Sequence, residues 1–153
     1  MPTQSTLPTN VYVRPATEQD APIIYDFICL LEDSILDVDA FNAVFQHNFS
    51  NPDVHYLVAE RAGVVVGFVS CHVQYLLHHT GKVGEIQELF VRPEVRSQGI
   101  GQQLVAALNT LALQETFVNL EVTTNQKRLD TIRFYERELF IRTHVKLVKP
   151  IHT

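Results

Sequence analysis

Residues 85–101 read EIQELFVRPEVRSQGIG. The run from Glu85 to Val91 is predicted to form a strand that ends at Arg92-Pro93, and the glycine-rich turn that follows leads into a helix. Such a turn at a helix N-terminus leaves several backbone N–H groups free, and the helix dipole adds partial positive charge. Arg96 adds a full charge. The turn therefore suits an anionic pyrophosphate, although an ordinary strand-to-helix connection would show the same pattern.

Two well-known phosphate-binding motifs are excluded for this turn. A Walker A loop requires Gly-Lys followed by Ser or Thr, which the sequence does not contain. The dinucleotide fingerprint requires a third glycine, and the turn has only Gly99 and Gly101.

Around this stretch the sequence predicts strands and helices in the order β-α-α-β-β-β-α-β-α-β. A helix opens at Thr17 or Asp20, and a second follows Asp37 or Asp39. The further elements are a third helix through residues 104–111, a fourth at 129–137, and strands at 11–14, 56–61, 64–75, 117–122 and 141–148. Tight turns join the middle strands. We therefore expect an α+β fold, with a mixed, mostly antiparallel sheet and helices on both of its faces.

Length and composition indicate one globular domain. The chain has 153 residues, of which 46% are hydrophobic and 19% charged, so a disordered chain or a rod is excluded. We predict a loose tail over residues 1–10 and a single domain over residues 11–153. The net charge of −5 argues against a protein that mainly grips nucleic acid or an anionic membrane. Two separated cysteines, Cys29 and Cys71, predict reduced thiols and a cytoplasmic location.

The motifs resemble those of the GNAT superfamily of N-acetyltransferases. The loop from Arg96 to Gly101 matches the Arg/Gln-x-x-Gly-x-Gly/Ala pattern of that superfamily. Other parts of the sequence match the superfamily as well: the flanks of the loop, the opening segment 13–20, and Phe134-Tyr135. A narrower resemblance is to the aminoalkylphosphonate N-acetyltransferases, and it is carried by residues 78–79, 84–89, 124–128 and 133–135.

This resemblance implies a GNAT fold with acetyl-CoA as the cofactor. The pyrophosphate would bind the amides of the loop, and the pantetheine arm would pair with the strand before it like an added strand. The implied cofactor-binding residues are Leu89, Phe90, Val91, Arg96, Ser97, Gln98, Gly99, Ile100 and Gly101. An N–H of Leu89 or Phe90 would polarise the thioester carbonyl.

Three residues are the catalytic candidates. The acceptor amine must lose a proton, and we expect Glu88 to take it, with Glu85 as the second choice. The alternative for both is a surface carboxylate at a strand edge. The leaving thiolate needs a proton, and Tyr135 occupies the family position for this donor. A half-buried helix aromatic is the alternative there.

The acceptor site is assigned to His78, His79, Gln87, Lys127 and Arg128. The histidines would bind a phosphonate as imidazolium, or would hold a divalent metal that does so, as the resemblance suggests; a solvated turn is the alternative. Lys127 and Arg128 would meet an anionic substrate, or would be a solvated helix N-terminus.

The sequence thus predicts an acetyl-CoA-dependent N-acetyltransferase that acts on the primary amine of a small molecule, with an aminoalkylphosphonate favoured. The alternatives are a GNAT enzyme for a polyamine, a peptide or protein amine or an aminoglycoside, and a non-catalytic acyl-CoA-binding module. A homodimer is left open.

Overall fold

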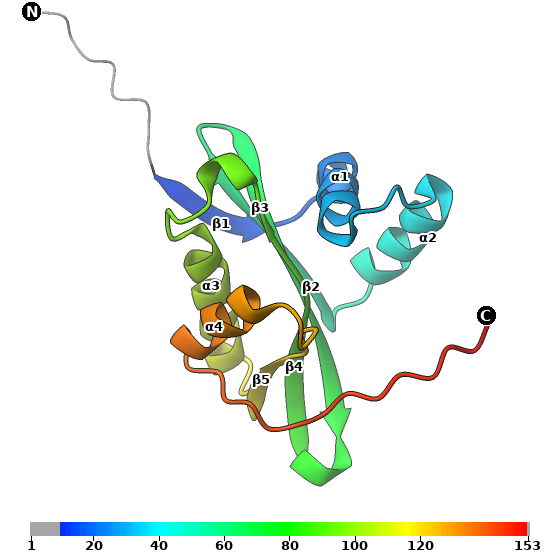
Figure 1. The fold of residues 1–153 in the computed structure, drawn as a ribbon, viewed down its shortest axis with the longest axis vertical. Coiled ribbons are helices and arrows are strands. Elements are labelled where there is room, and N and C mark those ends of the chain that lie inside the picture. Colours follow the sequence, from blue (N-terminus) through cyan, green and yellow to red (C-terminus); the bar gives the residue numbers. More distant parts are fainter. Residues whose placement is uncertain (1–9, 153) are drawn as a thin grey trace, which may run out of the picture.

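The computed structural model describes residues 10–152 and contains a five-stranded sheet with helices on both faces (Figure 1). The strands lie in sequence order across the sheet: β1 (Val11–Pro15), β2 (Val54–Arg61), β3 (Val64–Leu76), β4 (Gly81–Val91) and β5 (Asn119–Val122). The first four run antiparallel, and β5 runs parallel to β4. The predicted α+β fold with a mixed, mostly antiparallel sheet is confirmed. Of the predicted N-terminal tail, residues 1–9 lie outside the described part.

Two pairs of helices cover the sheet. On one face lie α1 (Ala21–Glu32) and α2 (Val38–Phe49), and on the other α3 (Ile100–Gln114) and α4 (Leu129–Arg137) (Figure 1). Short 3-10 turns are η1 (Glu18–Asp20), η2 (Leu77–His79) and η3 (Pro93–Val95). Within residues 10–152, no helix is both long enough and apolar enough to cross a membrane.

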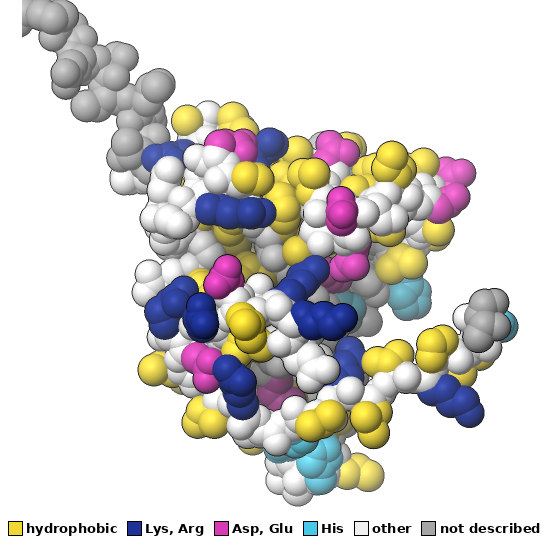
Figure 2. All heavy atoms as spheres, in the orientation of Figure 1, with side chains coloured by type: hydrophobic (Ala, Val, Ile, Leu, Met, Phe, Trp, Pro, Cys, Tyr) yellow, Lys and Arg dark blue, Asp and Glu magenta, His cyan; other side chains and the backbone are white. Residues whose placement is uncertain are grey.

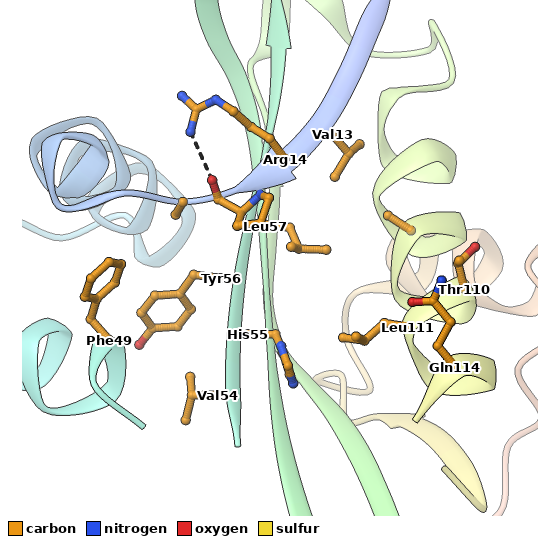
Figure 3. A pocket seen from close by; sticks show the side chains of 13 residues that line it. Val13, Arg14, Phe49, Val54, His55, Tyr56, Leu57, Thr110, Leu111 and Gln114 are labelled. Atoms are coloured by element: carbon orange, nitrogen blue, oxygen red, sulfur yellow. Dashed lines mark hydrogen bonds between the residues drawn. The ribbon is translucent and has the colours of Figure 1, made fainter. Parts of the chain in front are cut away.

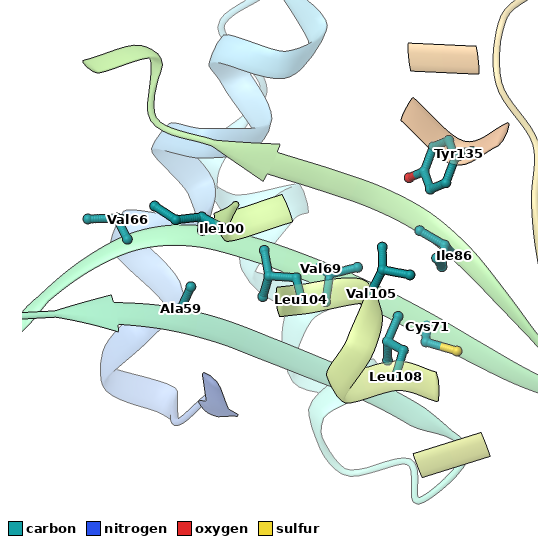
Figure 4. Close-up of a cluster of buried hydrophobic side chains, with 10 residues drawn as sticks. All are labelled: Ala59, Val66, Val69, Cys71, Ile86, Ile100, Leu104, Val105, Leu108 and Tyr135. Atoms are coloured by element: carbon teal, nitrogen blue, oxygen red, sulfur yellow. The ribbon is translucent and has the colours of Figure 1, made fainter. Parts of the chain in front are cut away.

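Each face of the sheet has its own apolar core. Under α1 and α2, the rings of Phe27 and Phe90 lie 4.8 Å apart, beside Phe45 and Phe68. Under α3 and α4 lies a second cluster, drawn in Figure 4, whose members from the helices are Ile100, Leu104, Val105, Leu108 and Tyr135. Strand β4 contributes Phe90 to the first core and Ile86 to the second.

The start of α1 is fixed by one ion pair. Both candidate start residues have a role, because Thr17 caps η1 and Asp20 stands immediately before α1. Arg14, on β1, donates from Nη1 and Nη2 to the two carboxylate oxygens of Asp20, at 2.8 and 3.1 Å. The backbone N–H of Thr17 donates to the same carboxylate at 2.7 Å. These bonds connect the first strand to the first helix.

The predicted last strand over residues 141–148 is wrong for this chain. The described residues beyond α4 form no helix or strand. Alternating apolar residues led to the prediction, but a strand also needs a neighbouring strand to bind its backbone, and this segment has none beside it. The predicted strand at 117–122 is shorter than expected and begins at Asn119.

We predict that Asp20→Asn destabilises the protein by about 2 kcal/mol at pH 7, because it removes the charge from a buried, hydrogen-bonded carboxylate. The hydrogen bonds from Arg14 hold the pKa of Asp20 below its ordinary value. This stabilisation is therefore complete above the unfolded pKa of about 3.9 and is lost as the pH falls through the lower folded pKa.

Urea unfolding from pH 7 to pH 2 measures this effect. The stability difference between wild type and Asp20→Asn should shrink at acidic pH. Exposed Glu18, in the same turn, gives the control variant Glu18→Gln, which should behave as wild type. A constant difference at all pH values would contradict the role of the ion pair.

Candidate active site

The site is built on a stretch of β4 that lacks a strand partner on one side. Strand β3 pairs with β4 as far as Val91, which lies opposite Gly67. Strand β5 pairs with β4 only as far as Ile86, which lies opposite Val122. Among the described strands, residues 87–91 of β4 therefore have a free edge. An extended amide-containing chain can bind such an edge as an additional strand.

A β-bulge lies where β4 and β5 separate. Ser70 pairs with Glu88 and the next residue, Cys71, pairs with Ile86, so Gln87 is an extra residue in β4. A bulge bends its strand and increases the local twist, and both changes help β4 to diverge from β5. The bulge also explains why Ile86 and Phe90 pack on opposite faces although they are four residues apart.

The glycine-rich loop follows the free edge directly. Ser97 and Gly99 have positive φ angles of 62° and 80°, and α3 then begins without a side-chain cap among the described residues. Arg96 donates from Nε to the carbonyl of Val91 at 3.0 Å, and Gln98 accepts a hydrogen bond from Arg61 at 2.7 Å. The loop therefore presents uncapped helix amides and a cation beside the end of β4.

The packing of α3 against α4 also favours glycine at position 101. A Cβ atom at this position would lie 3.2 Å from the ring of Phe134 on α4. Close packing of α3 against α4 thus favours a residue without a side chain, because any Cβ atom here would require the Phe134 ring to shift slightly.

Glu88 belongs to a row of polar side chains across three strands. Tyr56, Ser70 and Glu88 are register partners on β2, β3 and β4. Ser70, fully buried, donates from Oγ to Glu88 Oε2 at 2.7 Å and accepts from the Glu88 N–H at 3.0 Å. Tyr56 accepts a hydrogen bond from Asn48 at 2.8 Å, and burial, with a smaller effect from the Glu88 charge, raises the pKa of Tyr56. The row fixes the carboxylate of Glu88 in one orientation.

The sequence analysis did not single out Ser70, Tyr56 or Asn48. A signal for Ser70 was present, because it is a lone hydroxyl within the apolar run of β3. Nothing in the sequence indicates that Asn48, at the end of α2, meets Tyr56.

Glu85 and Gln87 occupy different surroundings. Glu85 lies where β4 is still paired, opposite Glu121, and accepts a hydrogen bond from Thr123 at 3.2 Å. It is three residues from Glu88 along β4 and away from the free edge. Gln87 is the exposed bulge residue at the start of that edge. The geometry favours Glu88 over Glu85 as the group nearest the unpaired stretch.

Tyr135 approaches the free edge from the opposite face of the sheet. Its ring is 5% exposed and packs edge-on against Phe134 and Phe140. In Figure 4 it lies over β4 near Ile86, with its hydroxyl pointing along the strand toward the C-terminal end. Burial raises the pKa of Tyr135 above its ordinary value, so the hydroxyl holds its proton at neutral pH.

A groove of about 560 Å³ passes between the end of β4, α1 and the start of α4. Its lining includes Phe90 and four cations: Arg96, Lys127, Arg128 and Arg133. Arg128 donates to the carbonyl of Leu31 at 3.3 Å and so connects α4 with α1 across the groove. Figure 2 shows Lys and Arg side chains gathered on this face of the molecule. The groove therefore suits an anion.

The histidine pair lies away from this groove. His78 and His79 are in η2, at the tip of the β3–β4 hairpin, with ring centroids 4.3 Å apart. The strand rises about 23 Å over the seven residues from Gly81, the first residue of β4, to Glu88. His79 Nε2 lies 3.8 Å from Glu121 Oε2. Within residues 10–152, no cluster of three His, Cys, Asp or Glu residues is arranged to hold a metal ion.

A second hollow, of about 340 Å³, lies at the β1–β2 edge of the sheet and contains none of the predicted site residues (Figure 3). It is lined by Tyr56 and Phe49 on the α2 side and by Leu111 and Gln114 on the α3 side. His55 also lines it, with a buried Nε2 that has no hydrogen-bond partner in the described structure.

Comparison with known proteins gives consistent matches. Residues 23–139 match the model of the acetyltransferase (GNAT) family. The aminoalkylphosphonate N-acetyltransferase of Salmonella typhimurium is 43% identical over 139 residues, which are 91% of this chain and 90% of that protein.

Among solved structures, a transcriptional regulator from Bacillus halodurans superposes with a TM-score of 0.85 at 23% identity, over 93% of this chain and 100% of that one. AAC(6')-Iy in complex with a CoA bisubstrate analogue superposes with a TM-score of 0.83 at 16% identity, over 95% and 100% of the two chains.

We predict that Gly99→Val weakens acetyl-CoA binding by more than about tenfold, because the side chain would cover the loop amides. One lost hydrogen bond to a charged group costs about 1.5–3 kcal/mol, which is at least about a tenfold loss of affinity. The matched control is Gly63→Val. Gly63 has a similar φ of 78° and, within the described structure, open space around its Cβ position.

Both variants should lose about 1–2 kcal/mol of stability through backbone strain, which thermal unfolding reports. Only Gly99→Val should lose affinity in calorimetry. Equal affinities in the two folded variants would show that the loop is not the pyrophosphate site.

Proposed function

This chain belongs to the acetyltransferase (GNAT) family, and on that basis we propose that it transfers the acetyl group of acetyl-CoA to the primary amine of an aminoalkylphosphonate. That the chain is an N-acetyltransferase follows from its family and its relatives. The acceptor and the roles of individual residues are the proposal. The observation that carries it is the free edge of β4, which lies between Glu88 on one face of the sheet, Tyr135 on the other and a cationic groove at its end.

Acetyl-CoA binds along the free edge in this proposal. The uncapped amides at the start of α3 and the guanidinium of Arg96 take the pyrophosphate. Leu89 and Val91 present their backbone to the pantetheine arm, whose amide groups resemble a strand. The N–H of Leu89 then donates to the thioester oxygen, where negative charge develops as the amine attacks, because the N–H groups of Glu88 and Arg92 donate toward β3 and that of Phe90 points the same way.

The amine enters from the α1–α2 side, where Glu88 lies. A primary amine with a pKa near that of lysine, about 10.4, is protonated at pH 7 and must lose a proton before it attacks. Glu88 Oε2 is occupied by the Ser70 hydroxyl, but a carboxylate has further acceptor positions for an ammonium. Glu88 thus binds the ammonium and takes its proton, directly or through a water molecule.

The thiolate leaves on the α3–α4 side, where Tyr135 lies. As the carbon–sulfur bond breaks, the hydroxyl of Tyr135 gives its proton to sulfur. A tyrosine whose pKa is raised by burial remains protonated until this step. Proton acceptor and proton donor therefore act from opposite faces of one sheet, and their tasks do not interfere.

The phosphonate group is assigned to the cationic groove. An aminoalkylphosphonate carries its anion only a few bonds from its amine, so a positive site must lie near Glu88. Lys127 and Arg128 line the groove that also contains Phe90, two residues beyond Glu88 on β4. Asp130 is the only acidic residue in the described lining of this groove, which disfavours a polyamine.

His78 and His79 fit this acceptor site less well. They lie at the tip of the β3–β4 hairpin and do not line the cationic groove, and the described residues give them no third donor suited to a metal. A divalent metal at this pair stays a prediction from the resemblance, and no step of the proposed transfer passes through it.

We predict that Tyr135→Phe lowers kcat by about 100- to 10,000-fold, the usual contribution of a general acid, and leaves acetyl-CoA affinity nearly unchanged. The phenylalanine ring keeps the packing against Phe134 and Phe140. Steady-state kinetics and calorimetry separate the two effects. Turnover at the wild-type rate would mean that another group protonates the thiolate.

We also predict that aminoethylphosphonate is acetylated much faster than ethanolamine or spermidine. Arg128→Ala should raise the KM for aminoethylphosphonate by about tenfold or more, because it removes a charge-assisted contact, and should leave the ethanolamine KM unchanged.

The comparison variant carries His78→Ala and His79→Ala together. If only this variant raises the phosphonate KM, the anion binds at the hairpin tip and the groove assignment is wrong. If spermidine is acetylated as fast as the phosphonate, the proposed acceptor class is wrong, although the family assignment stands.

A further inference from the structure

Within residues 10–152, Tyr135 is held in place by its ring and not by its hydroxyl. The ring lies between two others, with the centroid of Phe134 at 5.1 Å and that of Phe140 at 5.3 Å. Both neighbours meet it edge-on, at interplanar angles of 69° and 72°. Burial alone raises the pKa of Tyr135, with no contribution from a hydrogen bond or a charge among the described residues. The direction of the hydroxyl therefore depends on the two aromatic contacts.

The two neighbouring rings reach Tyr135 in different ways. Phe134 precedes it in α4, so the helix itself fixes this contact. Phe140 comes from beyond α4 and reaches Tyr135 only because the chain turns back. The N–H of Phe140 donates to the carbonyl of Tyr135 at 3.0 Å, and the N–H of Leu139 donates to the carbonyl of Glu136 at 3.1 Å. The second contact is thus made by a turn and not by the helix.

This turn is unfavourable for its sequence. Leu139 has a positive φ of 72°, in the left-handed region that a residue with a Cβ atom avoids. Its side chain is 88% exposed and gains little from packing. A backbone in such a conformation persists only where its surroundings fix it. Besides the two backbone hydrogen bonds, the surroundings that fix this turn are the contacts of half-buried Phe140 with Tyr135 and the core beneath α3 and α4.

The orientation of the Tyr135 ring matters for the proposed chemistry. A proton donor must lie within hydrogen-bond distance of the atom that receives the proton, and a displacement of about 1 Å costs about 100-fold in rate. In Figure 4 the hydroxyl points along β4 toward the C-terminal end of the strand, where the free edge lies. Without the ring of Phe140 on one side, the ring of Tyr135 would be free to tilt away from this direction.

We propose that Phe140 is a positioning residue for acetyl transfer, whose ring holds that of Tyr135 so that the hydroxyl faces the thioester sulfur at the free edge of β4. This inference rests on the proposed role of Tyr135 as the proton donor. Phe140 acts through Tyr135 and not on either substrate. Its loss is therefore expected to lower kcat and to leave the binding of acetyl-CoA nearly unchanged.

Two substitutions at Phe140 test the proposal. Phe140→Leu keeps an apolar side chain but removes the flat ring, and should lower kcat by about tenfold or more. The Kd for acetyl-CoA in calorimetry should stay within about twofold of the wild-type value. Phe140→Tyr keeps the ring, and its hydroxyl can reach water from this half-buried position, so it should retain the wild-type kcat. The assay uses the fastest acceptor among aminoethylphosphonate, ethanolamine and spermidine, so the result does not depend on the acceptor class.

The chain offers a matched control for the loss of an aromatic contact. Phe41 meets Tyr25 edge-on with centroids 5.2 Å apart and an interplanar angle of 74°, nearly the geometry of Phe140 against Tyr135. Phe41→Leu should lower the melting temperature to a similar extent as Phe140→Leu but should leave kcat unchanged. Leu139→Gly should also keep the wild-type kcat, with a melting temperature at least as high, because glycine adopts the same turn without strain.

A double-mutant cycle shows whether Phe140 acts through the hydroxyl of Tyr135. In a chain that already carries Tyr135→Phe, there is no hydroxyl left to orient. Phe140→Leu should therefore cause no further loss of kcat in that chain, although it lowers kcat when the tyrosine is present. A residue that only stabilises the fold would lower kcat in both chains.

The other outcomes separate this inference from the proposed function. If Tyr135→Phe is slow but Phe140→Leu has the wild-type kcat, the positioning role is wrong and the proton donor stands. If Tyr135→Phe itself has the wild-type kcat, both are wrong. Additive losses in the double variant, or an equal loss of kcat in Phe41→Leu, would show a general loosening of the fold and overturn the positioning role alone. The same holds if Leu139→Gly loses as much activity as Phe140→Leu.

Discussion

The separation of β4 from β5 is the constraint on which the proposed active site depends. As far as Ile86 the two strands share hydrogen bonds, and beyond it β4 continues with β3 alone. The extra residue at Gln87 bends β4 at this point and reverses which face its later side chains meet. A fully paired sheet would have used the same backbone groups internally, and no edge would remain to bind an extended ligand.

The bulge also distributes the chemistry between the two layers of the fold. Glu88 is directed to the face covered by α1 and α2, where Ser70 and its hydrogen bonds hold the carboxylate. Tyr135 belongs to the core on the other face, where burial keeps its hydroxyl protonated. In the proposed mechanism, neither group needs to move for the other to act. The loop that follows β4 then places uncapped amides of α3 at the end of the same edge.

The two apolar cores hold these parts at fixed positions. Phe90 packs against Phe27 and fixes the end of β4 beneath α1. Gly101 allows α3 to approach Phe134 on α4, the residue next to Tyr135. Core packing and site geometry thus depend on the same residues, so that a change in one layer is expected to reach Glu88 and Tyr135.

The sequence by itself determined the elements that local patterns specify. The period of apolar residues indicated the four helices, the hairpin turn indicated the β2–β3 pair, and the glycines of residues 96–101 indicated the turn before α3. The resemblance of those motifs also indicated the family. Glu88 and Tyr135 were candidates on the same basis, and their roles remain proposals.

Only the tertiary structure decided which of these residues meet. The alternation of apolar and polar residues in β4 cannot show the bulge at Gln87. A bulge is recognised only when the pairing of the strand with its partner is known. Ser70 and Asn48 became part of the Glu88 row only through pairing across three strands. The backbone of His78 and His79, at the tip of the β3–β4 hairpin, lies apart from Glu88 because most of β4 separates them. Tertiary structure also decided that residues 141–148 form no strand. They carry the pattern of a strand, but a strand forms only where a second backbone is present to bind it.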